Sequence, residues 1–303
     1  MTERIDVEII TDDGLTLRAW LYLPRHAGPR PAITMAHGFG GTREMGLDRY
    51  ARKFADAGFV VLVHDHRSFG ASDGVPRNDV EPWRQIADWR RAISYLETRP
   101  EVDAGRIGVW GTSFAGGHSI VLGATDMRIK CAVAQVPTIS GFEQWQRKVA
   151  PERIEGFELT ALEDERAQAT GAEPRYVTTI GDGPGSAALF TTADAVRFHR
   201  DLVPPGDMNN TVTLRSNRAS RLYEPGVWIE RVSPTPLMMI VETAETVIPA
   251  DIQLAAYERA LQPKELVLLP GGHFDAYDVQ FDESSDAALS WFSTHLDRTA
   301  TAA

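Results

Sequence analysis

The chain has very little cysteine, no long apolar run and no excess of basic residues, and each shortage excludes a class of protein. Its 303 residues include one cysteine, Cys131, so no intrachain disulfide can form, and we expect the thiol to be a small buried apolar group. No apolar run approaches the roughly 20 residues that a membrane-spanning helix needs. The first residues also lack the basic and apolar regions of a signal peptide. We therefore expect a cytoplasmic protein that does not enter a membrane.

The charge balance argues against a nucleic-acid partner. The chain has 31 Lys and Arg against 42 Asp and Glu, a formal net charge of −11. Proteins that bind nucleic acids usually carry a basic patch, and the sequence shows none. Hydrophobic residues make up 43% and charged residues 24%, ordinary values for a globular protein. The length suits one large core with an insertion.

Apolar stretches recur in the order expected for a parallel sheet covered by helices. Two alternating stretches at 5–10 and 15–23 predict an antiparallel hairpin. After them, nearly continuous apolar strands alternate with helical patterns, which is typical of a mostly parallel α/β sheet covered on both faces. We predict these strands at 32–36, 59–63, 106–110, 129–136, 237–241 and 264–269, with helices at about 43–57, 82–98, directly after 113, 249–260 and 282–295.

The alternation stops between Pro137 and Pro234. Helical stretches such as 152–170 mix there with glycine- and proline-rich loops, and no regular succession of strands is visible. We therefore predict a core formed by residues 1–136 and 235–303, with a mainly helical cap inserted at 137–234.

One pentapeptide points to nucleophilic chemistry. Gly111-Thr112-Ser113-Phe114-Ala115 follows the strand at 106–110 and precedes a helical stretch. This is the setting of a nucleophile elbow, in which small residues two before and two after the serine allow a sharp turn that exposes the hydroxyl. Alanine stands here where glycine is more common, and it still fits. Such a pentapeptide has many chance matches, so a Ser113 that only caps a helix is the alternative.

Two glycine-rich turns accompany the elbow. His37-Gly38-Phe39-Gly40-Gly41 follows the strand at 32–36, and Pro270-Gly271-Gly272-His273 follows the last strand. A histidine that ends the second of these turns, after the last strand, could reach over the sheet edge to the elbow serine. A third segment, Asp65-His66-Arg67-Ser68-Phe69-Gly70-Ala71-Ser72, also follows a strand.

Together these motifs resemble the α/β-hydrolase superfamily along the whole chain. The closest resemblance is to small cap-bearing serine hydrolases grouped with dienelactone-hydrolase-like and peptidase-like esterases. It implies an α/β-hydrolase fold with a mostly parallel eight-stranded sheet, and catalysis by Ser113 with His273 as general base. Dienelactone hydrolase itself has a cysteine nucleophile, and this elbow presents a serine, so thiol chemistry does not carry over.

The triad acid is less clearly marked, because the loop after 237–241 contains no aspartate. In related proteins an aspartate commonly lies four residues before a proline in this loop, and Glu245 has that position relative to Pro249. A carboxylate is all that the role needs, so we predict Glu245 as the acid. Glu242 and Asp251 are the alternatives.

The resemblance also implies an oxyanion hole made by the backbone N–H groups of Phe39 and Phe114. Aromatic residues of the predicted cap offer a substrate pocket, and among them we select Phe142 and Trp145 as lining residues. The alternative is that these rings form the core of the cap.

We set aside a metal site and a phosphate loop. His64-Asp65-His66 contains metal-ligand residue types, but in a continuing strand the two histidines point to opposite sides, and we expect Asp65 and Arg67 to form an ion pair. The glycines at 181, 183 and 185 do not follow a strand, which argues against a phosphate-binding loop.

The sequence thus predicts a cofactor-free serine hydrolase, of the carboxylic ester hydrolase class (EC 3.1), acting on a small-molecule ester, thioester or lactone. Amide hydrolysis, carbon–carbon cleavage and acyl transfer use the same residues, so these reactions are alternatives. The alternative that is not an enzyme is a binding or regulatory protein that kept the fold and lost the catalytic activity. The sequence does not specify an oligomeric state, although a homodimer is compatible with it.

Overall fold

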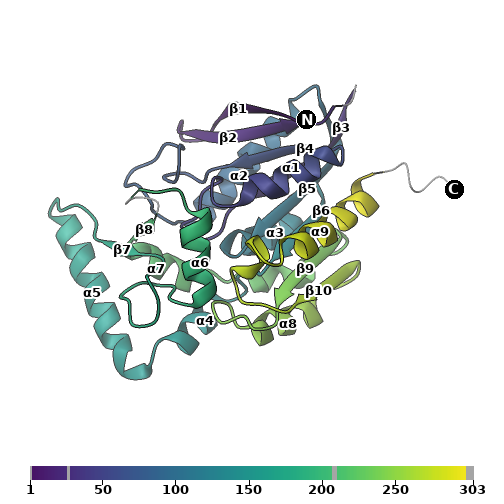
Figure 1. Ribbon diagram of the computed structural model, residues 1–303. Coiled ribbons are helices and arrows are strands. Elements are labelled where there is room, and N and C mark those ends of the chain that lie inside the picture. Colours follow the sequence, from purple (N-terminus) through teal and green to yellow (C-terminus); the bar gives the residue numbers. More distant parts are fainter. Residues whose placement is uncertain (1, 26–27, 207–209, 298–303) are drawn as a thin grey trace.

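Eight strands form one sheet at the centre of the protein (Figure 1). The structure is a computed structural model that describes residues 2–25, 28–206 and 210–297. The strands are β1 (Glu3–Ile10), β2 (Thr16–Leu23), β3 (Arg30–Ala36), β4 (Val60–His64), β5 (Val102–Thr112), β6 (Ile129–Gln135), β9 (Leu237–Glu242) and β10 (Lys264–Leu269). They lie in the order β1-β2-β4-β3-β5-β6-β9-β10, with β1–β2 and β2–β4 antiparallel and the remaining pairs parallel.

Helices cover both faces of this sheet and create two apolar cores. One face carries α1 (Leu47–Asp56) and α9 (Phe281–Leu296), and the other carries α2 (Pro82–Glu97), α3 (Phe114–Thr125) and α8 (Ala250–Arg259). Successive side chains of β5 alternate between the cores, since Val109 packs in one and Trp110 in the other. A Cβ atom at Gly108 would lie 2.7 Å from the Phe292 ring, so glycine is what lets α9 lie close to the sheet.

The predicted α/β fold with an eight-stranded, mostly parallel sheet is confirmed. Most strand and helix bounds agree with the expectation within a few residues. One difference is the helix expected from Arg43, which begins only at Leu47. Gly46 precedes it with a φ of 84°, a left-handed conformation that ends the preceding turn and separates it from the helix.

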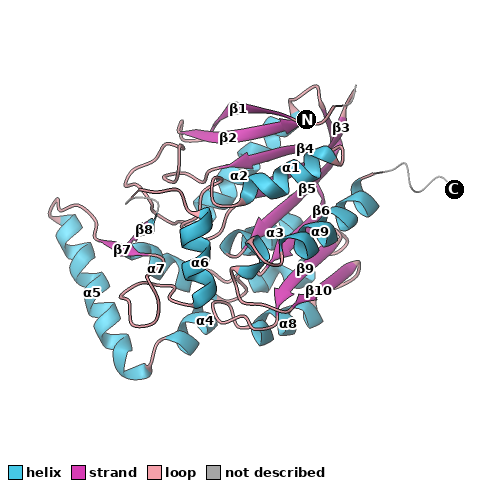
Figure 2. Cartoon of the chain, in the orientation of Figure 1, coloured by secondary structure: helices cyan, strands magenta, loops and turns pink. Residues whose placement is uncertain are grey.

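The segment between β6 and β9 lies outside the main sheet. It contains α4 (Gly141–Lys148), α5 (Pro151–Ala169), β7 (Tyr176–Thr178), α6 (Ala193–Leu202), β8 (Thr211–Thr213), α7 (Leu214–Arg221) and the 3-10 helix η2 (Pro225–Arg231). Strands β7 and β8 pair only with each other. In Figure 2 the arrowheads of β5 and β9 point toward the side where α4 and α6 lie, so this segment stands over the carboxyl ends of the parallel strands. None of the described helices combines the length and apolarity needed to cross a membrane.

Candidate active site

Ser113 occupies a strained turn between β5 and α3. Its φ of 58° and ψ of −118° lie in a region that residues with a side chain rarely adopt. The turn is held by the Ser113 amide, which donates to the Gln135 carbonyl at 2.8 Å, and by the Ser113 carbonyl, which accepts from the Thr138 amide at 2.9 Å. A Cβ atom at Gly111 would lie 1.9 Å from the Ala115 carbonyl oxygen, so this position requires glycine, whereas Ala115 itself is accommodated. Ser113 therefore has the geometry of a nucleophile elbow.

His273 joins Ser113 to Glu245 in one chain of hydrogen bonds. The Ser113 hydroxyl donates to His273 Nε2 at 2.9 Å, and His273 Nδ1–H donates to Glu245 Oε2 at 2.5 Å. The other oxygen of Glu245 accepts from the amides of Val247 at 2.6 Å and Ile248 at 3.0 Å. Three donors thus fix the carboxylate, and the carboxylate selects the imidazole tautomer whose Nε2 can accept a proton from serine.

The two alternatives for the acid lie elsewhere. Asp251 is on the surface, where it pairs with Arg147 at 2.7 Å. Glu242, the last residue of β9, is fully buried, and neither of its carboxyl oxygens has a hydrogen-bond partner in the described residues. Its burial, together with the nearby negative charges of Asp275 and Glu245, raises the pKa of Glu242 to about 8. Glu242 is therefore protonated at neutral pH and does not compete with Glu245 for the histidine.

The glycine-rich turn after β3 lies directly against the serine. A Cβ atom at Gly38 would lie 2.6 Å from Ser113 Cβ, so glycine alone permits this approach. Within the described residues, the Phe39 and Phe114 amides donate no hydrogen bond, and the two rings meet edge to face at 5.7 Å. Unused N–H groups on both sides of a nucleophile are the arrangement that an oxyanion hole requires.

Tyr277, in the loop that carries His273, connects the turn after β3 to the end of β5. Its ring stacks on His37, with centroids 5.3 Å apart and planes 5° apart, and its hydroxyl bonds Thr112 Oγ1 at 2.6 Å. His37 in turn donates from Nε2 to the Met45 carbonyl at 3.0 Å and accepts the Gly38 amide at Nδ1. Burial lowers the pKa of His37 to about 3, so this ring stays neutral. No sequence motif indicated this role for Tyr277, because only the fold brings 37, 112 and 277 together.

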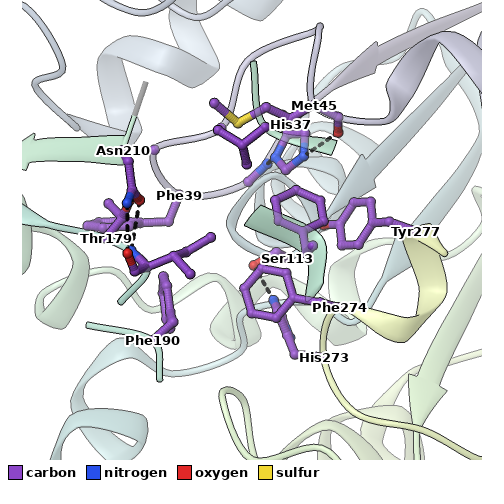
Figure 3. A pocket seen from close by; sticks show the side chains of 16 residues that line it. His37, Phe39, Met45, Ser113, Thr179, Phe190, Asn210, His273, Phe274 and Tyr277 are labelled. Atoms are coloured by element: carbon purple, nitrogen blue, oxygen red, sulfur yellow. Dashed lines mark hydrogen bonds between the residues drawn. The ribbon is translucent and has the colours of Figure 1, made fainter. Parts of the chain in front are cut away.

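A mainly apolar pocket opens beside Ser113 and His273 (Figure 3). Its cavity volume is about 30 Å³, and the figure of about 460 Å³ for all atom-free space around it includes open solvent. Its lining combines the glycine-rich turn and Met45, which follow β3, with side chains from the segment between β6 and β9 and from the histidine loop. These side chains are Thr179, Ile180, Phe190, Phe198, Val203, Asn210, Phe274 and Tyr277. Such a lining suits an apolar acyl group.

Phe142 and Trp145 are not among the residues that line this pocket, so their role in substrate binding stays a prediction. Both lie on α4, where Phe142 is half exposed and the Trp145 ring packs against the Arg221 guanidinium at 4.6 Å. Aromatic composition marked the segment as pocket-forming, but it could not show which rings face the serine. The rings that do line the pocket with Ser113 are those of Phe190, just before α6, and Phe198, within α6.

The segment after β4 also differs from expectation. The rings of His64 and His66 lie 5.1 Å apart rather than on opposite sides, because the strand ends at His64 and its alternation stops there. Asp65 does not pair with Arg67: it accepts the Arg43 amide at 2.8 Å and faces its guanidinium, whereas Arg67 bonds Asp88 through two nitrogens at 2.6 Å each. The described residues contain no group of three or more His, Cys, Asp or Glu side chains placed to hold a metal ion.

Comparison with known proteins assigns the family. The model of the X-Pro dipeptidyl-peptidase (S15) family matches residues 13–275. The chain belongs to the S15 family. This S15-family chain is 32% identical over 295 residues to a polyketide transferase of Penicillium sp., covering 97% of both chains. It is 33% identical to the quorum-quenching protein AidA of Acinetobacter baumannii, covering 90% of this chain and 88% of that one.

A thiohydrolase of Eupenicillium brefeldianum is 29% identical to the S15-family chain, with 91% of this chain and 89% of that one covered. Among solved structures, the α/β-hydrolase GrgF from Penicillium sp. sh18 superimposes with a TM-score of 0.84 at 29% identity, covering 97% of this chain and 99% of that one. The S15-family chain is thus an α/β-hydrolase related to thiohydrolases and polyketide transferases.

Proposed function

We propose that the protein cleaves a thioester, or an activated ester or lactone, through an acyl-enzyme on Ser113. The observation that carries this proposal is the unbroken chain from Ser113 through His273 to Glu245 at the edge of an apolar pocket. Relatives named as a thiohydrolase and a polyketide transferase support an acyl thioester as the donor. The apolar lining favours a hydrophobic acyl group, and Ser113 itself lines this pocket.

Each step has a residue in place. Ser113 Oγ attacks the carbonyl carbon while its proton passes to His273 Nε2, and Glu245 stabilises the resulting imidazolium. The amides of Phe39 and Phe114 hold the oxyanion, each contributing on the order of 3 kcal/mol. The carbon–sulfur bond then breaks, and the imidazolium protonates the departing thiolate. Water, or the hydroxyl or amine of an acceptor, gives its proton to His273 and attacks the acyl-enzyme. The bond between the acyl group and Ser113 Oγ then breaks, and the imidazolium returns the proton to Ser113 as the product leaves.

Hydrolysis and acyl transfer share every step up to the acyl-enzyme and differ only in what attacks it. We propose hydrolysis as the principal outcome, which the resemblance to a thiohydrolase supports, and acyl transfer as the alternative, which the resemblance to a polyketide transferase supports. A transferase would need an acceptor that reaches Ser113 ahead of water.

The test combines a fluorophosphonate probe with a hydrophobic acyl thioester. Ser113→Ala should abolish labelling and lower turnover by several orders of magnitude, whereas Ser290→Ala, on the exposed side of α9, should change neither. Free acid as the product supports hydrolysis, and an acylated alcohol or amine formed at its expense supports transfer. A folded wild-type protein that neither labels nor turns over would instead favour a binding protein.

A further inference from the structure

Three side chains on one face of helix α6 contact the loop that carries His273. Asp194, Arg197 and Phe198 follow at helical spacing, so they point the same way. They meet the loop formed by residues 272–278, which carries His273. Helix α6 belongs to the segment between β6 and β9, whereas this loop follows β10, so the contact joins two parts that are distant in the sequence.

Asp194 holds the backbone on both sides of the histidine. Its Oδ2 accepts the amide of Phe274, the residue after His273, at 2.9 Å. The same oxygen would lie 2.7 Å from a Cβ atom at Gly272, the residue before His273. The carboxylate therefore lies against one neighbour of the histidine and bonds the other.

Arg197 and Phe198 extend the attachment. The Arg197 guanidinium bonds Asp275 and donates from Nε to Asp278 at 3.0 Å. The Phe198 ring lies 5.0 Å from that of Phe274 and 5.1 Å from that of Tyr277. Both contacts hold α6 on the loop. Of these three α6 side chains, Asp194 is the one that bonds the backbone next to the histidine directly. On the other side of His273, the Gly272 amide donates to Asp275 Oδ2 at 2.8 Å.

We propose that Asp194 is a positioning residue for His273: by fixing the Phe274 amide, it sets the backbone from which the imidazole reaches Ser113. This inference rests on the proposed function, since it concerns the alignment of the same histidine. Catalysis depends steeply on such alignment, and a displacement of about 1 Å can cost about a hundredfold in rate. The segment that helps form the acyl pocket thereby also aligns the general base.

Three variants test the proposal. Asp194→Ala removes the acceptor, and kcat should fall about 10- to 100-fold with KM for the thioester changed less than about threefold. Asp194→Asn keeps an oxygen that can accept the Phe274 amide, and it should recover most of kcat. Arg200→Ala is the matched control, because Arg200 lies on the same helix and, among the described residues, hydrogen-bonds only the neighbouring Asp201 at 2.6 Å. Its kcat should equal that of the wild type.

Thermal melting identifies variants that are folded, and the rate of fluorophosphonate labelling reports on Ser113 without any substrate. Slow labelling by folded Asp194→Ala, restored in Asp194→Asn, supports the proposal. It is overturned if kcat of Asp194→Ala stays within twofold of the wild type, if KM rises while kcat holds, or if Asp194→Asn is as impaired as Asp194→Ala. An unreactive wild-type protein would contradict the proposed function itself, which separates the two failures.

Discussion

Glu242→Gln should flatten the dependence of stability on pH, because Glu242 is a buried carboxyl group with no hydrogen-bond partner in the described residues. Its pKa rises from 4.5 to about 8 in the folded protein. Between these values the unfolded chain has lost the proton and the folded protein still holds it. The folded state then binds more protons, so the free energy of unfolding decreases as pH rises.

The size of the effect follows from the same linkage. One pKa unit corresponds to about 1.4 kcal/mol, so this group alone removes about 2 kcal/mol of stability between about pH 5.5 and pH 7.5. Glutamine is neutral throughout and lacks this contribution. We therefore expect the wild type to lose about 2 kcal/mol more unfolding free energy than Glu242→Gln between about pH 5.5 and pH 7.5. Turnover should change little, because a neutral side chain replaces a neutral one.

Urea unfolding followed by the fluorescence of the seven tryptophans measures this shift at each pH. Glu265→Gln on the neighbouring strand β10 is the control, since that side chain is exposed, and its stability should follow the wild type at every pH. If the curves for Glu242→Gln and the wild type run parallel from pH 5.5 to 7.5, Glu242 is ionised in the folded protein and the argument fails.

Three further predictions concern single contacts. Glu245→Gln should lower kcat in an ester assay by about four orders of magnitude, because it favours the wrong imidazole tautomer. Asp251→Asn should leave kcat unchanged, and equal effects of the two variants would remove Glu245 from the triad. Tyr277→Phe, which deletes the bond to Thr112, should reduce stability by about 1 kcal/mol in urea unfolding, and an unchanged midpoint would contradict this. Arg67→Ala leaves the buried carboxylate of its partner Asp88 unpaired and should destabilise by about 3 kcal/mol; a loss below about 1 kcal/mol would show that water solvates that carboxylate.

Local chemistry made much of the fold predictable. Apolar strands of about six residues alternate with helical patterns, and each pattern has one period that suits one kind of element. The elbow and the two glycine-rich turns could be recognised because they need small residues at set positions; Gly111 and Gly38, for example, have no room for a side chain. The structure brings together Ser113, His273 and Glu245, all of which the motifs had selected.

The positions and pairings of side chains that the sequence did not predict share one cause. Phe142 and Trp145 have the right composition for a pocket, yet neither is among the residues that line the one beside Ser113, since the position of α4 depends on what it packs against. Asp65 and Arg67 are close in sequence, yet each has a partner from another element. Pairings of this kind depend on the path of the whole chain, which no local pattern reports.

The sequence by itself therefore determined the type of sheet, the sharp turn that carries Ser113 and the place of His273 after the last strand, because backbone sterics and the period of apolar residues act over a few neighbouring positions. Only the tertiary structure decided that Glu242 is buried with no hydrogen-bond partner among the described residues, that Tyr277 joins the turn after β3 to the end of β5, and that Asp194 of α6 bonds the backbone beside His273. The contacts of Tyr277 and Asp194 span from 80 to 240 residues, as in 194 to 274 and 37 to 277, and they form only when the packed sheet and the inserted segment bring those positions together.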